Sequence, residues 1–183
     1  MKKLIFLSIV ILTAVSCSTI KVTSDFDKTA PFANYKTFAF TNEALGLQIN
    51  DLNRNRLLTA IETELAAKGF TKSETNPDVW IDMQLRGEEI QTATATTTGG
   101  YPGYGYGYGY RYGWGGGFST TTIDYDTYVE GTLFIDMIDA KKKQLVWQGR
   151  GTKTLEPDAS QQKREENINY AVKQIFMKYP PQL

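Results

Sequence analysis

Histidine is absent from this chain of 183 residues, and cysteine occurs only once, as Cys17. Without histidine, the chain cannot form a Ser-His-Asp triad, a Cys-His pair or a histidine-ligated metal site. A single cysteine excludes an intramolecular disulfide and a thiolate cluster. Carboxylates, lysines and tyrosines can still support catalysis, but these residues are too common here to indicate a site.

An excess of charge of one sign is also missing, because 20 basic side chains balance 20 acidic ones. The two signs are mixed along the chain, so we expect neither nucleic acid nor an anionic surface as a partner. The 41% hydrophobic and 22% charged residues are ordinary for a globular protein, and the length suggests one domain. No pattern in the chain indicates a cofactor.

The N-terminus has the pattern of an export signal. Two lysines follow Met1, and residues 4–12 form an apolar run that is too short to span a bilayer. The sequence AVSC at residues 14–17 resembles the lipobox of bacterial lipoproteins, although that motif usually has leucine where this chain has its alanine. We therefore predict a lipoprotein signal peptide over residues 1–16 and lipid attachment, by acylation, at Cys17. The alternative is an ordinary signal peptide with a free cysteine near its cleavage site.

Acyl chains on Cys17 would anchor the mature chain stably in a membrane, because each buried CH₂ contributes about 0.8 kcal/mol. Ser18 follows the cysteine, whereas aspartate at that position resembles the inner-membrane retention signal of enteric bacteria. We therefore expect the protein in the cell envelope, lipid-anchored at the outer membrane. No acidic run follows the cysteine, so the expected orientation is toward the periplasm.

Residues 128–151 are predicted to form a β-hairpin around which the domain is built. Its first strand alternates apolar and polar residues, a polar turn occupies residues 139–143, and the second strand begins at Leu145. A hairpin alone is marginal in water, so other elements must cover its apolar face. Strands are also expected at residues 19–26, 35–40 and 79–88, with residues 91–98 as a candidate extension of the last one. A first helix is expected at residues 51–68, capped by Asn50 or Asp51. A second helix is expected to begin at a cap formed by Asp158 and to end at Pro180.

These elements run in the order β-β-α-β-β-β-α within a single domain at residues 17–183, which indicates an α+β fold. We predict a five-stranded, mixed and mostly antiparallel sheet with two helices packed on one face. The crossover through the first helix permits one parallel strand pair. The apolar alternate positions of the third and fourth strands, Leu85 and Val129 among them, would face the helices. The opposite face would be half exposed, with Trp80, Phe134 and Ile138 among Asp82, Thr132, Asp136 and Gln148.

Several segments together resemble a bacterial lipoprotein family that contains domain of unknown function 4136. They are SDFDKTAPFANYKTFAF, LAAKGF, NPDVWIDM, YVEGTLFIDMIDAKKKQLVWQGRG and NYAVKQIFMKYPP, and they follow one another in the family order over nearly all of the mature chain. The resemblance implies domain identity and an envelope location. It brings no assigned reaction, cofactor or catalytic residue.

A Gly/Tyr-rich segment at residues 99–118 is the least ordinary part of the chain, with 10 of the 16 glycines and 6 of the 11 tyrosines. Glycine has the largest backbone entropy to lose, so we predict a flexible loop. Its aromatic rings are a candidate interaction surface for an envelope protein or a glycan. The alternatives are a hairpin loop without a partner and self-association. The candidate residues are Tyr101, Tyr104, Tyr106, Tyr108, Tyr110, Tyr112 and Trp114.

Acidic residues offer two weaker candidates for a site. Asp124, Asp126 and Glu130 could gather a calcium ion, because hard cations prefer several carboxylate oxygens. Their spacing lacks the glycine and the further ligands of a known calcium loop, so a solvated strand face is the simpler interpretation. Glu88 and Glu89 are adjacent and would point to opposite faces of a strand, so they cannot act as a carboxylate pair.

On the open sheet face, Asp82, Asp136 and Arg150 are predicted to form ion pairs across the strands. Trp80 and Trp147 are interpreted as packing residues of the core or of the sheet face.

Taken together, the sequence favours a non-enzymatic interaction or structural module of the cell envelope. The alternative is a periplasmic enzyme, for example a glycan-acting one, that uses carboxylates on the open sheet face. That alternative predicts an acidic residue with a raised pKa in a concave cleft near residues 99–118. The sequence does not indicate an oligomeric state.

Overall fold

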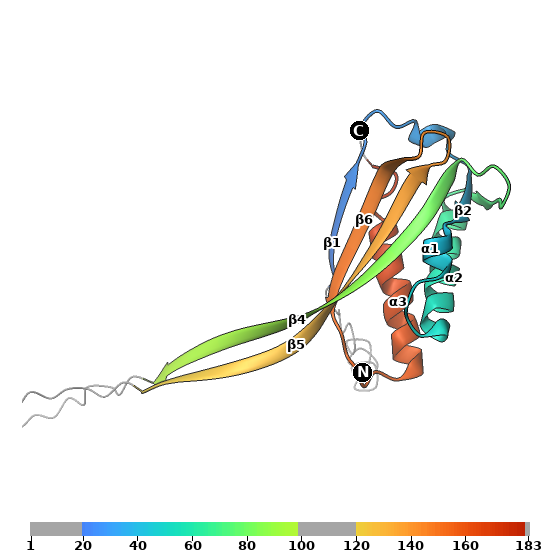
Figure 1. The fold of residues 1–183 in the computed structure, drawn as a ribbon. Helices are drawn as coiled ribbons and strands as arrows, with labels where there is room; N and C mark the ends of the chain where they lie inside the picture. The colour runs from blue at the N-terminus through green and yellow to red at the C-terminus, as the bar shows by residue number, and fades with distance from the viewer. Residues whose placement is uncertain (1–19, 99–119, 182–183) are drawn as a thin grey trace, which may run out of the picture.

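The computed structural model describes residues 20–98 and 120–181, which form a mixed sheet with helices against one face (Figure 1). The sheet has six strands in the order β1-β6-β5-β4-β2-β3. Within the described residues, no helix is both long and apolar enough to cross a membrane. In chain order the elements are β1 (Lys21–Phe26), η2 (Phe32–Asn34), β2 (Thr37–Phe40), α1 (Asn42–Leu45), α2 (Asp51–Ala67), β3 (Thr71–Lys72), β4 (Val79–Thr98), β5 (Thr120–Asp139), β6 (Gln144–Thr154) and α3 (Gln161–Phe176).

The predicted α+β class is confirmed, but the counts of five strands and two helices are wrong. The additional strand is β3, which contains two residues and pairs parallel with β2 through Thr37 and Thr71. The additional α-helix is α1, a single turn whose N-cap Thr41 accepts a hydrogen bond from the N–H of Ala44 at 3.1 Å. Both elements are too short for a periodicity to be recognised, which takes several repeats, so the sequence pattern cannot show them.

The predicted parallel pair and the predicted hairpin are both confirmed. β2 and β4 run parallel, with Phe38 opposite Val79, and α2 provides the crossover between them. β5 and β6 form the antiparallel hairpin. Its turn is held by Asp139, whose Oδ1 accepts hydrogen bonds from the N–H groups of Lys141 at 2.9 Å and Lys142 at 2.8 Å.

The two long helices begin and end with local signals, one of which was assigned to the wrong residue. Asn50 caps α2, because its Oδ1 accepts a hydrogen bond from the N–H of Leu52 at 3.0 Å. Gly69 follows α2 with a φ of 85°, the left-handed conformation expected at a helix end. For α3 the predicted cap Asp158 is wrong. Ser160 has the extended backbone of an N-cap, and its hydroxyl accepts from the N–H of Lys163.

The core lies between the sheet and the helices, which Figure 1 shows on the same side of the sheet. Each fully buried isoleucine of β4 and β5 contributes about 1.5–3 kcal/mol of burial free energy. On β6, the Trp147 ring stacks on Phe176 of α3 with 5.7 Å between centroids, and Gly149 leaves room for that ring. The helix-facing core residues of β4 and β5 are Val79, Ile81, Met83, Leu133, Ile135 and Met137.

β4 and β5 extend far beyond the other strands. Their pairing continues from Val79 opposite Asp139 to Thr98 opposite Thr120. The pairing of β6 with β5 ends at Glu130, so no third strand continues alongside the described residues beyond that point. Residues 89–98 and 120–129, which we call the arm, therefore form a two-stranded ribbon about 33 Å long at about 3.3 Å per residue. Figure 1 shows the arm projecting from the body, and the candidate extension at residues 91–98 is confirmed.

Candidate functional site

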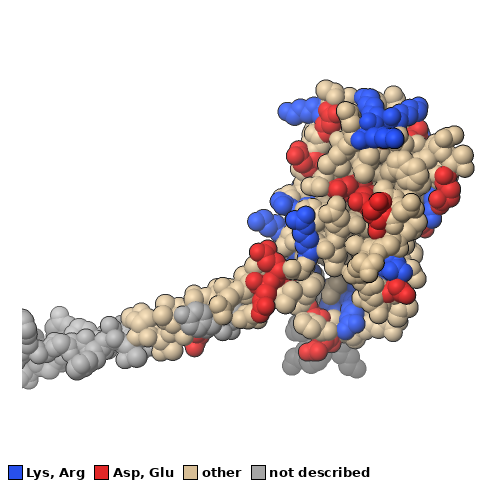
Figure 2. Space-filling view, viewed as in Figure 1, with Lys and Arg blue, Asp and Glu red and all other residues tan. Residues whose placement is uncertain are grey.

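The arm exposes backbone as well as side chains. The outer edges of both strands have no strand partner among the described residues. Along β4, the described side chains from residue 91 onward are exposed, and most of them are threonine or alanine. Figure 2 shows that charged side chains gather on the body and at the base of the arm, whereas the described part farther out is almost entirely uncharged. The β4 edge from residue 91 onward therefore lacks the charges, prolines and bulges that usually prevent strand pairing, whereas the β5 strand carries Asp124 and Asp126.

The helix-side face at the base of the arm is apolar. Leu85 and Val129 were expected to face the helices, but they are 41% and 36% exposed. Leu155 lies beside them, 45% exposed, and its side chain packs over Gly131. The prediction that these positions are covered is wrong, because β4 and β5 run past the part of the sheet that α2 and α3 cover.

The opposite sheet face is open, as predicted, and its charges are arranged in rows across the strands. The row nearest the arm pairs Glu88 directly with Glu130. The row in the middle of the face belongs to Asp136 and Asp82, which are also directly opposite each other. Two rows without acidic residues lie between these two acidic rows. The row next to the glutamates consists of Lys21, Thr152, Thr132 and Arg86. The following row consists of Thr23, Arg150, Phe134 and Gln84.

Phe134 lies between two arginines on this face. The guanidinium carbon of Arg86 is 5.3 Å from the ring centroid, and that of Arg150 is 6.0 Å from it, which is the range of cation–π attraction. Arg150 also donates a hydrogen bond from Nε to the hydroxyl of Thr23 at 3.2 Å. The arginines are thus held by an aromatic ring and by a hydroxyl.

The predicted ion pairs of Arg150 with Asp82 and Asp136 are wrong. Asp136 accepts a hydrogen bond from the Gln148 amide at 2.8 Å, and Asp82 accepts one from the Thr41 hydroxyl at 2.6 Å. The register explains the difference, because Arg150 lies opposite Phe134 rather than opposite an acidic residue.

The Asp136 carboxyl has an unusual electrostatic environment. Burial raises its pKa above the ordinary value; the hydrogen bond from Gln148 partly offsets this, and the negative charge of Asp82 adds to the rise. Asp139, three residues farther along β5, behaves in the opposite way. Burial would raise its pKa, but hydrogen bonds from the Lys142 N–H, the Tyr35 hydroxyl and the Lys141 N–H outweigh burial and lower it. Asp139 therefore acts as the anchor of a turn.

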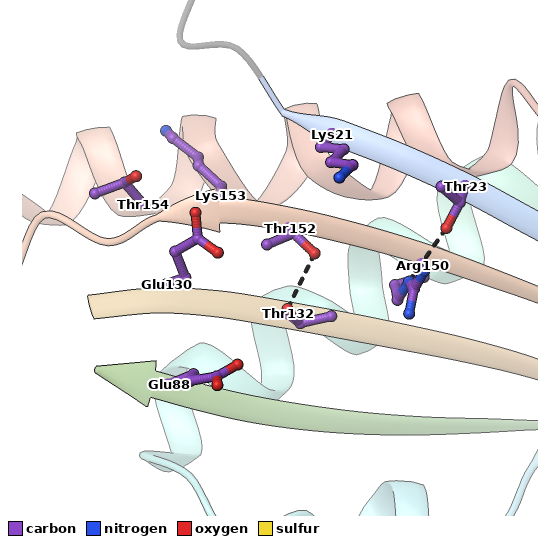
Figure 3. A pocket seen from close by; sticks show the side chains of 9 residues that line it. All are labelled: Lys21, Thr23, Glu88, Glu130, Thr132, Arg150, Thr152, Lys153 and Thr154. Carbon is purple, nitrogen blue, oxygen red and sulfur yellow. Dashed lines mark hydrogen bonds between the residues drawn. The ribbon is translucent and has the colours of Figure 1, made fainter. Parts of the chain in front are cut away.

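A hollow of about 420 Å³ lies where the two rows nearest the arm meet (Figure 3). Glu88 and Glu130 are at one end of it, and Lys21 and Arg150 are toward the other. Lys153 also lines it, but its ammonium donates a hydrogen bond to Asn167 of α3 at 2.7 Å. The remaining lining is hydroxyl-rich and consists of Thr23, Thr132, Thr152 and Thr154.

Many of the site residues predicted from the sequence lie outside the part of the chain that the structure describes. Cys17 lies outside the described residues, and so do all the candidate aromatics of residues 99–118. The side chain of Asp126 is also outside the described part, and the described acidic residues include no group of three that could hold a metal ion.

The expectations hold for two other pairs of described residues. Glu88 and Glu89 face opposite sides of β4, as predicted. Trp80 packs half-exposed on the open face, and Trp147 is fully buried, so their interpretation as packing residues is confirmed.

Comparisons with known proteins agree with the fold. The profile of the family described as Domain of unknown function (DUF4136) matches residues 22–181. The chain belongs to the DUF4136 family. No curated protein sequence matches this DUF4136 chain.

Solved structures with the same fold include a PDZ domain protein from Parabacteroides distasonis ATCC 8503, with a TM-score of 0.55 and 19% identity. That match covers 90% of this chain but only 36% of the PDZ domain protein, so this chain spans about a third of it. Two structures of the PelC dodecamer from Paraburkholderia phytofirmans have TM-scores of 0.42 and 0.44 at 10% and 11% identity. These matches cover 86% of this chain and 95% and 96% of the PelC chains.

Sequence reasoning missed the opposition of Glu88 to Glu130 and the basic row next to it. Period-two alternation does place all of these residues on the open face. A register signal was available in the glycines at 87 and 131, which the structure pairs directly. Aligning the two strands on that pair would have brought the glutamates together.

Proposed function

We propose that this DUF4136 protein is a membrane-anchored, non-enzymatic interaction module of the bacterial cell envelope, and that its arm contacts the partner. The observation that carries the proposal is the projecting ribbon formed by residues 89–98 and 120–129. A two-stranded ribbon is at best marginally stable in water by itself, so an additional strand or surface would stabilise it.

The backbone of the arm supports this role. Free N–H and C=O groups along a strand edge can pair with an extended segment of another chain, which is how β-augmentation provides affinity. The β4 strand of the arm is uncharged and threonine-rich beyond residue 90, so pairing along its edge meets no charge repulsion; the β5 strand carries Asp124 and Asp126. The aromatic side chains of residues 99–118 would add stacking contacts to a protein or a glycan at the end of the arm.

The N-terminus supports the anchored location. The lipobox-like sequence before Cys17 favours acylation of that cysteine, and only three residues separate it from β1. Four peptide steps span at most about 14 Å, so an acylated Cys17 would hold the body close to the membrane. The arm would then give the anchored domain a reach that its short tether does not.

The enzymatic alternative stays a prediction. It requires a carboxyl with a raised pKa inside a cleft, and the structure has the two features at separate places. The pKa of Asp136 is raised, but Asp136 does not line the hollow that contains Glu88 and Glu130.

In-cell photo-crosslinking tests the role of the arm. A crosslinker at Tyr106, or at the exposed Thr94 within the arm, should give one discrete adduct, and deletion of residues 99–118 should weaken the adduct formed from Thr94. A crosslinker at Lys142, in the hairpin turn of the body, is the matched control. A ladder of self-adducts would identify a second copy as the partner. Absence of any arm adduct, with unchanged envelope behaviour of the deletion variant, would refute the proposal.

Fractionation tests the anchor separately. Cys17→Ser should release the protein from the membrane fraction or leave its signal peptide uncut. Normal processing and unchanged membrane fractionation of that variant would overturn the anchored location, whatever the crosslinking shows.

A further inference from the structure

We infer that the hollow on the open sheet face is a binding site for a short peptide or amino acid that carries a carboxylate and an ammonium group. The inference does not depend on the arm or on the lipid anchor. It rests on two groups of opposite charge, Glu88 with Glu130 and Lys21 with Arg150, which line the same hollow but form no ion pairs with each other. It also rests on the distance that the sheet sets between these two groups.

The glutamates at the acidic end of the hollow have no ion-pair partner in the described part of the chain, since Lys153, which also lines the hollow, donates its hydrogen bond to Asn167 instead. Glu88 and Glu130 are directly opposite each other on β4 and β5. Like charges at directly opposed positions destabilise a sheet, so a purely structural role does not explain the pair. Among the described residues, no lysine or arginine forms an ion pair with either glutamate. An ammonium group placed between the two carboxylates would remove their repulsion and could donate a hydrogen bond to each of them.

The basic side chains at the other end of the hollow also have no ion-pair partner among the residues that the structure describes. Lys21 and Arg150 line the hollow, and neither forms an ion pair with a described carboxylate. Arg86 lies in the same row as Lys21, and its guanidinium rests on the Phe134 ring instead of on an acidic group. A ligand carboxylate would meet these cations, since arginine offers a fork of N–H donors that fits a carboxylate.

The hydroxyl groups between the two ends fit a polar ligand. Thr132 and Thr152 share a hydrogen bond with 3.0 Å between their oxygens, and each hydroxyl retains capacity for a further contact. Figure 3 shows these two threonines between the glutamates and Arg150. A peptide N–H or C=O group placed over them could donate to, or accept from, a threonine hydroxyl.

The sheet geometry sets the size of the ligand. Same-face neighbours along a strand are about 7 Å apart, so the glutamate row lies about 7 Å from the Lys21 row and about 13 Å from the Arg150 row. The shorter separation, about 7 Å, matches a lysine-type residue with a free α-carboxylate and a side-chain ammonium. Ligands with one sign of charge, such as nucleic acid or a sulfated glycan, would place an anion against the glutamates.

The test is an NMR titration of the full chain, purified in detergent, with the dipeptide N-acetyl-alanyl-lysine, whose only ammonium is on the lysine side chain. Two modified probes serve as ligand controls, one with the side-chain amine acetylated and one with the carboxylate amidated. A solvent-exposed site of this kind should bind the dipeptide with a dissociation constant of about 1 mM, and each modified probe about tenfold more weakly. Equal binding of the three probes, or no binding of the dipeptide, would overturn the inference.

Charge exchange within the hollow provides the sharper experiment. A basic-end variant carries Lys21→Glu with Arg150→Glu, and an acidic-end variant carries Glu88→Lys with Glu130→Lys. Each should lose binding about tenfold or more, whereas the variant with all four changes should recover it to within about threefold, because the ligand can bind in the reverse direction. Thermal unfolding of each variant establishes that the chain is folded.

A matched control separates a local site from general electrostatics. Lys142→Glu with Lys178→Glu changes the net charge as much as the basic-end variant does, at two exposed positions outside the hollow. This control should bind the dipeptide like the wild type. Loss of binding in the control as large as in the basic-end variant, or failure of the fourfold variant to recover binding while folded, would refute the site.

Discussion

Replacing Gly149 by alanine should destabilise this protein, although the same change at Gly87 should not. Both glycines lie within strands and face the helix side of the sheet. A Cβ at Gly149 would meet the Trp147 ring and the Cγ2 of Ile175 far inside van der Waals contact. A Cβ at Gly87 would find only Cγ1 of Val129, at 4.0 Å.

The magnitude follows from two terms. Trp147 and Ile175 are both fully buried, so neither can move without displacing the core, and such overpacking costs about 1–3 kcal/mol. Alanine restricts the unfolded chain more than glycine does, which stabilises each variant by about 0.4–1 kcal/mol. The steric cost is absent at Gly87, so the free energies of unfolding of the two variants should differ by about 1–3 kcal/mol.

Thermal and urea unfolding of the two variants measure this difference. For a domain of this size, 1 kcal/mol corresponds to about 2–4 °C, so Gly149→Ala should melt about 3–10 °C below Gly87→Ala. The urea midpoint should fall while the slope stays constant, because the exposed surface does not change. Equal melting temperatures for the two variants would show that the packing of Trp147 against α3 is looser than the structure indicates.

Three further outcomes are expected. The folded-state pKa of Asp139 is below its unfolded value, so the stability that its charge contributes is present above about pH 4 and is lost as the pH falls through the folded pKa. Asp139→Asn should therefore lower the free energy of unfolding, measured in urea, by about 1–3 kcal/mol at pH 7 and by less at pH 3. An equal loss at both pH values would contradict the role of the charge. Burial, together with the charge of Asp82, raises the folded-state pKa of Asp136, so stability is lost as the pH rises through that pKa. Asp136→Asn removes this buried charge and should stabilise the protein at pH 7 but not at pH 3. A loss of stability at pH 7 would contradict this. Replacing residues 90–128 by a short Gly/Ser turn should leave the melting temperature within about 2 °C, and a large drop in calorimetry would show that the arm is part of the cooperative core.

The sequence by itself determined which residues share a face of the sheet. Period-two alternation placed Ile81 and Ile135 toward the helices and Asp82 and Asp136 on the open side, and the structure agrees. Local signals placed the N-cap of α2 at Asn50 or Asp51, and the structure has it at Asn50, because a cap depends on nearby backbone groups. The sequence profile also carried the family membership over nearly the whole described chain.

Only the tertiary structure decided which residues meet across the strands and which surfaces stay uncovered. Alternation assigns a face but not a cross-strand neighbour, since the neighbour depends on the register that the hydrogen bonds select. This is why the opposition of Glu88 to Glu130 and the position of Arg150 over Phe134 could not be predicted from the pattern alone. The exposure of Leu85, which is apolar and alternates in phase with the core residues, has a second reason. How far the helices reach along a strand is a property of the assembled fold, and the arm begins where the helices no longer cover the sheet.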